Sequence, residues 1–360
     1  MEVFALDLGN KQTKMVSSKT LANLPNGSKV FPSVFMYHQD LGNQATIFKS
    51  KKKIDKYSTT KDTDFEYAWG EEVNQVKTEK FLDTLNFGNR YDQNEFKLLA
   101  TFALGELARD FEDAEKGILE CNVVTGVPSN DFNEQTIKTL IKVLQGDHQV
   151  SINGKSYNVR VKEVYVMNQP IGTIYNEMLD DEGYVHDESY LEDTVTVVDL
   201  GGGTFLVDTL KELQLDDKKR LQQDTGAYDL YNQILTSCVE AGIKGLKQYE
   251  LEKILRISNP EDGYYYKPNK NEAINITDHV RRAVKKYTIE RNNAIHAAVK
   301  DTSSIDKMLF TGGGSNLIDK ETTQKAFKYT QFIQDSETAN VKGYYKYGLA
   351  IELENNEVGE

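Results

Sequence analysis

The chain has 360 residues, of which 39% are hydrophobic and 28% charged; this composition is typical of a globular protein, and the length suits two domains. Acidic residues outnumber basic ones by 56 to 43, a net charge of −13, so direct electrostatic capture of nucleic acid is not expected. No apolar run approaches the ~20 residues of a membrane span, and the first expected strand leaves no room for a signal peptide. Cys121 and Cys238 lie in apolar segments, which indicates reduced, buried thiols and a cytoplasmic protein.

The first expected element is a hairpin over residues 3–18. Its first strand runs from Phe4 to Asp7, a turn follows through Gly9 and Asn10, and β-forming residues resume at once. Because glycine has no Cβ, such a turn can present backbone N–H groups to a close ligand. A phosphate is the ligand that this arrangement suits.

The next segment predicts strands at 29–37 and 45–48, followed by a polar stretch at 49–64 that includes Lys51 to Lys53. We interpret this stretch as a solvated loop, with a subunit contact as the alternative. Apolar residues at helical spacing predict helices at 94–109 and 131–145. The dipeptide Asn153-Gly154 predicts a tight hairpin turn.

A strand at 159–166 leads into Asn168-Gln169-Pro170. Pro170 suits the first helical position, and an apolar stripe at Ile171, Ile174, Tyr175 and Met178 follows it. Gln169 is therefore expected at a helix N-terminus, where it either caps the helix or serves a site.

The stretch from Thr196 to Val207 repeats the first hairpin about half a chain later. A strand delivers Asp199, three glycines and Thr204 follow, and β-forming residues resume. A single Asp-Gly pair is usually only a turn, but two in matched strand contexts are much less often accidental. The repeat predicts a duplicated domain with one metal-bound phosphate held between the halves, and a carboxylate such as Asp199 is a natural neighbour for its divalent cation.

The remaining elements are expected in a simple order. They are a charged turn at 211–221, a helix after Gly226, a helical piece at 249–255, an aromatic turn at 263–268, a long helix at 278–300, a strand ending in Gly312 to Gly314, and a closing helix at 344–352. Tyr264 to Tyr266 form either an assembly surface or a packed loop.

These three glycine clusters, in this order and spacing, resemble those of the actin-like ATPase superfamily, which includes actin, the Hsp70 chaperones and the sugar kinases. The resemblance covers nearly the whole chain. It implies an α/β fold of two duplicated, RNase H-like domains with a nucleotide cleft between them. Domain I is expected at residues 1–167 plus 338–360, and domain II at residues 168–337.

The resemblance also implies roles for individual residues. Asp7 and Asp199 would hold Mg²⁺, largely through water, and Gln169 would orient the attacking water, because an amide can accept a water's hydrogen bond although it cannot act as a base. Lys14 is expected either at phosphate or facing solvent, and Glu252 either at the ribose or adenine or beside a solvated Glu250–Lys253 pair. The residues expected to bind ATP or ADP are Gly9, Asn10, Thr13, Lys14, Gly201, Gly202, Gly203, Thr204, Gly226, Glu252, Gly312, Gly313 and Gly314.

Within the superfamily, the chain looks most like the ParM-type actins of Gram-positive plasmids. That resemblance implies an ATPase that assembles with MgATP into polar filaments, hydrolyses ATP to ADP and phosphate, and segregates plasmid DNA through a DNA-binding adaptor protein, without direct nucleic-acid or membrane contact. A non-polymerising kinase or regulatory ATPase of the same superfold is the alternative. Filament handedness, strand number, the choice between ATP and GTP and the adaptor's identity stay open, and no P-loop, zincin or Cys-x-x-Cys signature is present.

Overall fold

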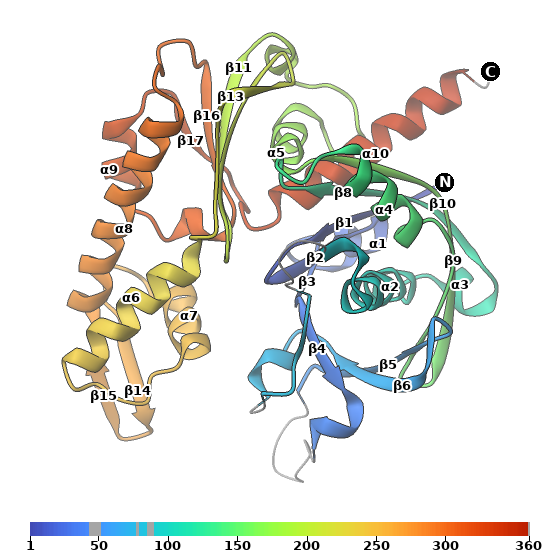
Figure 1. Cartoon of the computed structure of the whole chain (residues 1–360), viewed down its shortest axis with the longest axis horizontal. Coiled ribbons are helices and arrows are strands. Elements are labelled where there is room, and N and C mark those ends of the chain that lie inside the picture. The colour runs from blue at the N-terminus through green and yellow to red at the C-terminus, as the bar shows by residue number, and fades with distance from the viewer. Residues whose placement is uncertain (43–51, 77–78, 85–89, 359–360) are drawn as a thin grey trace. The chain divides into compact units, whose positions relative to one another are not determined.

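A computed structural model describes residues 1–42, 52–76, 79–84 and 90–358. The chain divides into two compact units, Met1–Glu188 with Thr338–Glu360 (unit 1) and Ser189–Glu337 (unit 2). Figure 1 labels their helices and strands. None of the helices in the described ranges has the length and apolar character needed to cross a bilayer.

Unit 1 is built on a mixed sheet in which the described strands lie in the order β3-β2-β1-β8-β10-β9-β5-β6-β4-β7. Its first half consists of β1 (Glu2–Leu8), β2 (Gln12–Val16), β3 (Lys29–Pro32), β8 (Leu119–Val127) and β10 (Lys155–Asn168). β1 pairs antiparallel with β2, as the predicted hairpin requires, whereas β1, β8 and β10 run parallel. The carboxyl ends of these three parallel strands therefore meet at one edge of the sheet.

The second half of this sheet consists of β4 (Val34–Tyr37), β5 (Asp55–Thr59), β6 (Asp62–Trp69), β7 (Leu82–Asp83) and β9 (Gly146–Ile152). The hairpin turn predicted between β9 and β10 is confirmed, since Asn153 and Gly154 both have positive φ, 53° and 86°. The strand predicted at 29–37 is broken at Ser33 into β3 and β4. The strand predicted at 45–48 lies outside the described residues.

The prediction of a loop at 49–64 is wrong from residue 55 onward, because β5 and the start of β6 occupy this range. Tyr57 and Thr59 are buried while the residues between and beside them are polar and partly exposed, so the outward face of β5 gives the segment a loop-like composition. Within the basic run, Lys53 pairs with Glu71 at 2.8 Å, and Lys51 lies outside the described residues.

Helices cover the sheet of unit 1. They are α1 (Ser18–Asn23), α2 (Asn94–Ala108), α3 (Glu112–Lys116), α4 (Glu134–Leu144), α5 (Gln169–Met178) and α10 (Ala339–Val358), with 3-10 turns η1 (His38–Leu41), η2 (Val73–Gln75) and η3 (Arg90–Asp92). The predicted helix at 94–109 is confirmed, and Phe102 of α2 packs against the buried rings of Tyr57 and Trp69. α4 begins three residues later than predicted, because the Asn133 side chain caps it by accepting from the Thr136 N–H.

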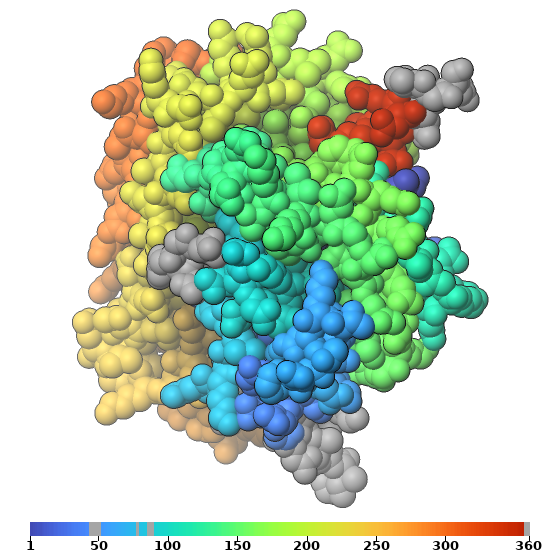
Figure 2. All heavy atoms as spheres, turned by 45° about the vertical axis from the view of Figure 1, so that its right-hand side comes forward, coloured from blue at the N-terminus to red at the C-terminus, as the bar shows by residue number. Residues whose placement is uncertain are grey.

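Helix α5 packs against α10 within unit 1. Tyr175 and Tyr347 stack at 4.8 Å, and the Lys346 Nζ donates to the carbonyl oxygens of Asn176 and Leu179, each at 2.9 Å. α5, and Gln169 with it, lies in compact unit 1, which extends to Glu188, whereas the predicted domain boundary is at residue 167. Figure 2 shows the end of α10, in red, beside the first residues of the chain, in dark blue, where the Met1 ammonium pairs with Glu352 at 3.2 Å.

Unit 2 contains a five-stranded sheet in the order β13-β12-β11-β16-β17 and a separate hairpin. Its strands are β11 (Thr194–Leu200), β12 (Phe205–Lys211), β13 (Gln214–Gln223), β14 (Tyr265–Asn269), β15 (Glu272–Asn275), β16 (Lys307–Thr311) and β17 (Thr330–Phe332). Its helices are α6 (Ala227–Glu240), α7 (Gln248–Ile257), α8 (Thr277–Ala298) and α9 (Lys320–Ala326), with η5 (Gly313–Asn316) and η4 (Glu188–Leu191) at the start of the unit.

Two predicted turns in unit 2 are wrong. Residues 211–221 lie mostly in strand β13, and the turn itself is confined to Glu212 and Leu213, both with positive φ. Residues 265–269 form β14 of a hairpin rather than an aromatic turn. β13 lies at an edge of the sheet, where charged side chains are common, and its polar residues therefore make it difficult to predict as a strand.

The two large sheets share one connectivity. In unit 1, the four neighbouring strand pairs of β3-β2-β1-β8-β10 are, in this order, antiparallel, antiparallel, parallel and parallel. The four pairs of β13-β12-β11-β16-β17 in unit 2 have the same directions in the same order. The predicted internal duplication is confirmed at this level. It makes β1 and β11 equivalent, and each of them carries an aspartate shortly before a glycine turn.

Candidate functional site

The first glycine turn joins β1 to β2 in unit 1. Asp7 is buried near the end of β1, and the pairing continues through Leu8 opposite Thr13. A Cβ atom on Gly9 would lie 2.8 Å from the carbonyl oxygen of Gln12, closer than side chains tolerate. The turn therefore requires glycine at this position.

Lys14 forms an ion pair with Asp7. The strand register sets these two residues opposite each other, and the Lys14 Nζ lies 3.0 Å from the Asp7 Oδ2, with both side chains largely buried. The alternative that Lys14 faces solvent is therefore wrong. The ammonium offsets the charge of a carboxylate that burial would otherwise make costly.

Thr13 lies beneath the turn in a chain of hydroxyl groups. The Ser33 Oγ donates to the Gly9 carbonyl oxygen at 2.7 Å, and the Thr13 Oγ1 lies 3.0 Å from the same Ser33 Oγ. Because the single proton of Ser33 is used on Gly9, Thr13 donates its own proton to Ser33. Thr13 is also fully buried and supports the turn from below, and its donation to phosphate stays a prediction.

Arg90 is a second support for this turn, and no sequence pattern pointed to it. Its Nη2 donates to the Gly9 carbonyl oxygen at 2.9 Å, and its Nε donates to the Thr84 carbonyl oxygen at 3.2 Å. Desolvation of the buried guanidinium lowers the pKa of Arg90 from its ordinary value. The contact joins residues 81 positions apart, so only the tertiary structure reveals it.

Gln169 is the first residue of α5, at the edge where β1, β8 and β10 end. Asn168 is the last residue of β10 and pairs with Val127 of β8, whereas Leu6 of β1 pairs with Thr125 of the same strand. The predicted position of Gln169 at a helix start, followed by proline, is thus confirmed. Asn168 is the N-cap residue, and its side chain makes no capping hydrogen bond.

The second glycine turn joins β11 to β12 in unit 2. Asp199 is buried one residue before the end of β11, and the Gly201 N–H donates to the Thr204 carbonyl oxygen at 2.9 Å. The last pair of residues in the β11–β12 ladder before the turn is Leu200 and Phe205. The predicted strand, turn and returning strand are confirmed.

The start of α6 packs directly on this turn. The N–H groups of Ala227 and Tyr228 donate to the carbonyl oxygens of Gly201 and Gly202, each at 2.9 Å. A trans peptide directs its C=O and N–H in opposite directions, so the N–H groups of Gly202 and Gly203 point away from α6. A Cβ on Gly226 would lie 2.5 Å from both of those carbonyl oxygens, which explains glycine at the helix cap.

Arg291 of α8 fixes the residue before that cap. Its Nη1 donates to the Thr225 carbonyl oxygen at 3.0 Å and to the Thr225 Oγ1 at 2.5 Å. The guanidinium lies over the rings of Phe205 and Tyr287, 5.0 and 5.1 Å from their centroids. Each unit thus has an arginine, held against aromatic rings, that binds main chain next to a glycine turn.

The third glycine cluster lies against Asp199. Asp199 pairs with Thr311 in the parallel register of β11 and β16, and Gly312 follows with φ 79° and ψ 156°. A Cβ on Gly312 would lie 2.4 Å from the Asp199 Oδ1 and 2.5 Å from the Leu200 carbonyl oxygen. Gly314 is similarly tight, at 2.8 Å from the same carbonyl oxygen. The glycines allow this loop to approach the second turn.

Glu252 of α7 belongs to an ion-pair cluster beside this loop. The Arg256 Nη2 lies 3.1 Å from the Glu252 Oε1, and both terminal nitrogens of Arg256 bind the Glu337 carboxylate, at 2.7 and 2.9 Å. Hydrogen bonding to Glu337 raises the pKa of Arg256. Glu337 is also the residue nearest a Cβ on Gly313, at 3.6 Å. Sequence reasoning identified Glu252 alone and missed Arg256 and Glu337.

Glu250 has a different role from the one considered for it. Its carboxylate accepts from the Lys247 N–H at 3.0 Å and caps the start of α7. The structure thus gives Glu250 a capping role, which the alternative of a solvated Glu250–Lys253 pair did not include.

Each unit thus assembles one part of the predicted site. Unit 1 holds Asp7, Gly9, Asn10, Thr13, Lys14 and Gln169; unit 2 holds Asp199, Gly201, Gly202, Gly203, Thr204, Gly226, Glu252, Gly312, Gly313 and Gly314. Among the described residues, no three His, Cys, Asp or Glu side chains gather as a metal cage. One aspartate in each unit fits Mg²⁺, which keeps most of its water and is bound by one or two carboxylates together with phosphates.

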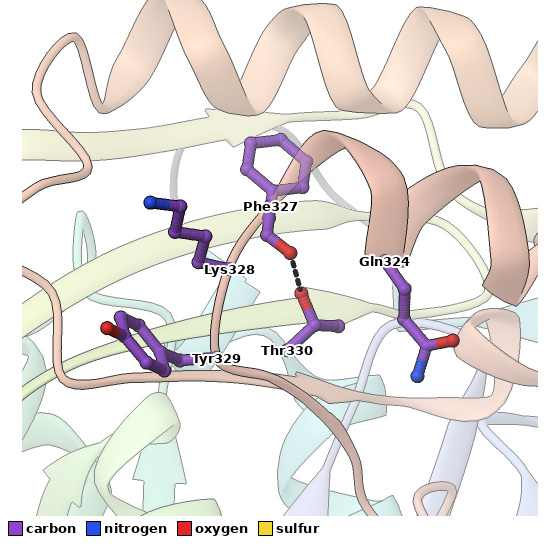
Figure 3. Close-up of a pocket in the computed structure, with 5 residues that line it drawn as sticks. All are labelled: Gln324, Phe327, Lys328, Tyr329 and Thr330. Atoms are coloured by element: carbon purple, nitrogen blue, oxygen red, sulfur yellow. Dashed lines mark hydrogen bonds between the residues drawn. The ribbon is translucent and has the colours of Figure 1, made fainter.

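A surface pocket lies elsewhere in unit 2. It is lined by Gln324, Phe327, Lys328, Tyr329 and Thr330, where α9 leads into β17. Figure 3 shows that the Thr330 hydroxyl donates to the Phe327 carbonyl oxygen, at 3.0 Å, so that bond fixes the turn itself. None of the predicted site residues lines this pocket.

The duplicated sheet, with a glycine turn after the first strand of each copy, defines an actin-like fold. Residues 5–172 match the family model described as actin like proteins N terminal domain, and residues 194–347 match the Alp7A C-terminal domain. The chain belongs to the actin-like proteins, as the sequence predicted. No curated protein matches it.

Solved structures agree on the fold. The chain is similar to apo pSK41 ParM, with 24% identity, a TM-score of 0.75 and coverage of 100% of this chain and 99% of that one. It is similar to the actin-like protein Alp7A, with 14% identity, a TM-score of 0.78 and coverage of 99% and 98%. The archaeal actin homolog Ta0583 gives 16% identity, a TM-score of 0.73 and coverage of 96% and 98%. The predicted two-domain, actin-like α/β fold is confirmed.

Proposed function

We propose that the chain is a cytoplasmic, filament-forming ATPase that assembles with MgATP and hydrolyses it to ADP and phosphate. The observation that carries the proposal is the pair of glycine turns, each placed after a buried aspartate at the equivalent strand end of a duplicated fold. Support comes from two similar structures with ADP, one of Ta0583 and one of a Bacillus thuringiensis ParM hybrid protein.

The turns would bind the phosphates through main-chain N–H groups. In the second turn the Gly202 and Gly203 N–H groups point away from α6, as the peptide geometry requires. Lys14 and the Thr204 hydroxyl would add donors to phosphate oxygens. Asp7 and Asp199 would hold Mg²⁺, mainly through its water, and the ion would neutralise charge on the phosphates.

The remaining residues would bind the nucleoside and the water. Gly312, Gly313 and Gly314 would allow the adenosine to lie close to the main chain beside Gly226, with Glu252 at the ribose or adenine. Gln169 would accept a hydrogen bond from the attacking water and so direct its lone pair. Lys14, in leaving Asp7 for a phosphate, would exchange one anionic partner for another.

The biological role that we propose is plasmid segregation. The support is the likeness of fold to pSK41 ParM and Alp7A, together with the likeness to the structure of an Alp12 filament. A net charge of −13 opposes direct binding to DNA, so the filament would act on DNA through a DNA-binding adaptor protein at a plasmid centromere.

The proposal is tested by following right-angle light scattering of the purified protein after MgATP is added, with phosphate release recorded in the same sample. A rise in scattering that decays as phosphate appears supports a dynamic filament. Nucleotide binding with flat scattering favours a non-polymerising kinase or regulatory ATPase, which acceptor screening would then distinguish. Failure to bind MgATP at all would refute the nucleotide site itself.

A further inference from the structure

The 3-10 turn η3 carries the side chain that orients the first glycine turn. We propose that Arg90 is a positioning residue: it holds the Gly9 carbonyl group so that the opposite side of the turn presents its N–H groups to phosphate. The proposal rests on the proposed function, because it assigns a role within the same nucleotide site.

The geometry of the guanidinium fixes the direction of one peptide group. Arg90 uses two nitrogens of its planar fork, Nη2 on the Gly9 oxygen at 2.9 Å and Nε on the Thr84 oxygen at 3.2 Å. Two main-chain anchors leave the fork little freedom to rotate. The Ser33 hydroxyl donates to the same Gly9 oxygen at 2.7 Å, so this carbonyl receives two hydrogen bonds from beneath the turn.

That direction has a consequence for the other side of the turn. The described chain has no cis peptide bond, so the Gly9–Asn10 peptide is trans and its N–H points opposite to its C=O. Donors that bind the Gly9 oxygen from below therefore aim the Asn10 N–H outward. This is the direction in which a turn binds an anion.

The positive charge of Arg90 also favours an anion at the turn. The guanidinium lies over the ring of Phe96, 5.0 Å from its centroid, and interacts electrostatically with Asp7. Arg90 and Lys14 thus place two positive charges around one buried aspartate. The two cations exceed the single carboxylate by one positive charge, which favours an approaching phosphate within a protein that is acidic as a whole.

A packing role for η3 is the competing explanation, and the neighbouring residue separates the two. The Tyr91 hydroxyl donates to the Asp131 Oδ2 at 2.8 Å, which ties the same 3-10 turn to the loop after β8. Tyr91→Phe removes this tie, and with it the interaction of the Tyr91 hydroxyl with the guanidinium, but keeps the hydrogen bonds of Arg90 to Gly9 and Thr84. It is therefore the matched control for any general loosening of η3.

The test measures dissociation constants for MgATP and for AMP in the full-length wild-type protein and in Arg90→Met, Arg90→Lys and Tyr91→Phe, by competition with a fluorescent nucleotide. AMP lacks the outer phosphates that the turn would bind. Loss of a hydrogen bond from a charged donor should raise the dissociation constant of Arg90→Met for MgATP by about 10- to 100-fold, with AMP unchanged. Arg90→Lys should lose part of this affinity, since one ammonium cannot reproduce the fork.

Several outcomes overturn the proposal. They are unchanged MgATP affinity in Arg90→Met, an equal loss for AMP, or an equal loss in Tyr91→Phe. If circular dichroism shows that Arg90→Met does not fold, the affinity of Arg90→Lys for MgATP becomes the test. Wild-type affinity in that variant would contradict the positioning role of the guanidinium. Absence of MgATP binding in the wild-type protein would instead refute the proposed function.

Discussion

Replacing Gly312 by alanine should damage both the stability of unit 2 and nucleotide binding. Gly312 has φ 79° and ψ 156°, a region that is essentially restricted to glycine. The new methyl group would also lie 2.4 Å from the Asp199 Oδ1 and 2.5 Å from the Leu200 carbonyl oxygen. The loop or Asp199 must therefore move.

The magnitude follows from these two costs. Backbone strain of this kind costs about 1–3 kcal/mol, and overpacking a tight site costs about another 1–3 kcal/mol. We therefore expect Gly312→Ala to lower the free energy of unfolding by roughly 2–6 kcal/mol. Because the new methyl group would lie against Asp199, affinity for MgATP should fall as well.

Gly242 offers a matched control in the same unit. Its φ is +82°, and a Cβ there would meet nothing within 4 Å, so Gly242→Ala should cost only the backbone term, about 1–2 kcal/mol. Urea unfolding followed by circular dichroism reports helices in both units, while fluorescence of the single tryptophan, Trp69, reports unit 1. The reasoning fails if Gly312→Ala is no more destabilising than Gly242→Ala, or if it binds MgATP like the wild-type protein.

Three further predictions concern single side chains. Asp199→Ala should abolish MgATP hydrolysis, and unchanged phosphate release would remove Asp199 from the site. Gln169→Ala should still bind ATP and assemble but release phosphate roughly 100-fold more slowly, because the water is no longer oriented; a normal rate would return Gln169 to a structural role. Burial lowers the pKa of His148 from 6.5 to about 4, so the unfolded chain binds more protons between these pH values. The free energy of unfolding should therefore fall by about 3 kcal/mol from pH 7 to pH 4, and His148→Gln should lose this pH dependence in urea titrations; an equal slope in the variant would contradict the assignment.

Several features of the site could be predicted because they depend on short stretches of chain. A strand that ends in an aspartate and a glycine turn is specified by residues that are adjacent in sequence, as at Asp7 and Asp199. The helix start at Gln169 is marked by the proline that follows it. Internal repetition of the first pattern then indicated a duplicated fold, which the matching strand orders of the two sheets confirm.

Strands with one polar face were harder to predict. Charged side chains lie at partly exposed positions of β5 and at partly or fully exposed positions of β13, so the local composition of both strands is that of a loop or turn. Their pairing with β9 and β12 supplies the main-chain hydrogen bonds that composition cannot reveal. The end of the first compact unit at residue 188 likewise depends on long-range packing, that of α5 against α10.

The sequence by itself determined where the chain can turn tightly and which carboxylates stand at those turns, because glycine and strand propensity act over a few neighbouring residues. Only the tertiary structure decided what surrounds the turns. Strand register set Lys14 opposite Asp7, and long-range packing brought Arg90 to Gly9 and Arg256 to Glu337, across 81 residues in each case. Such contacts are made when the whole sheet and its helices pack together, so no local pattern encodes them.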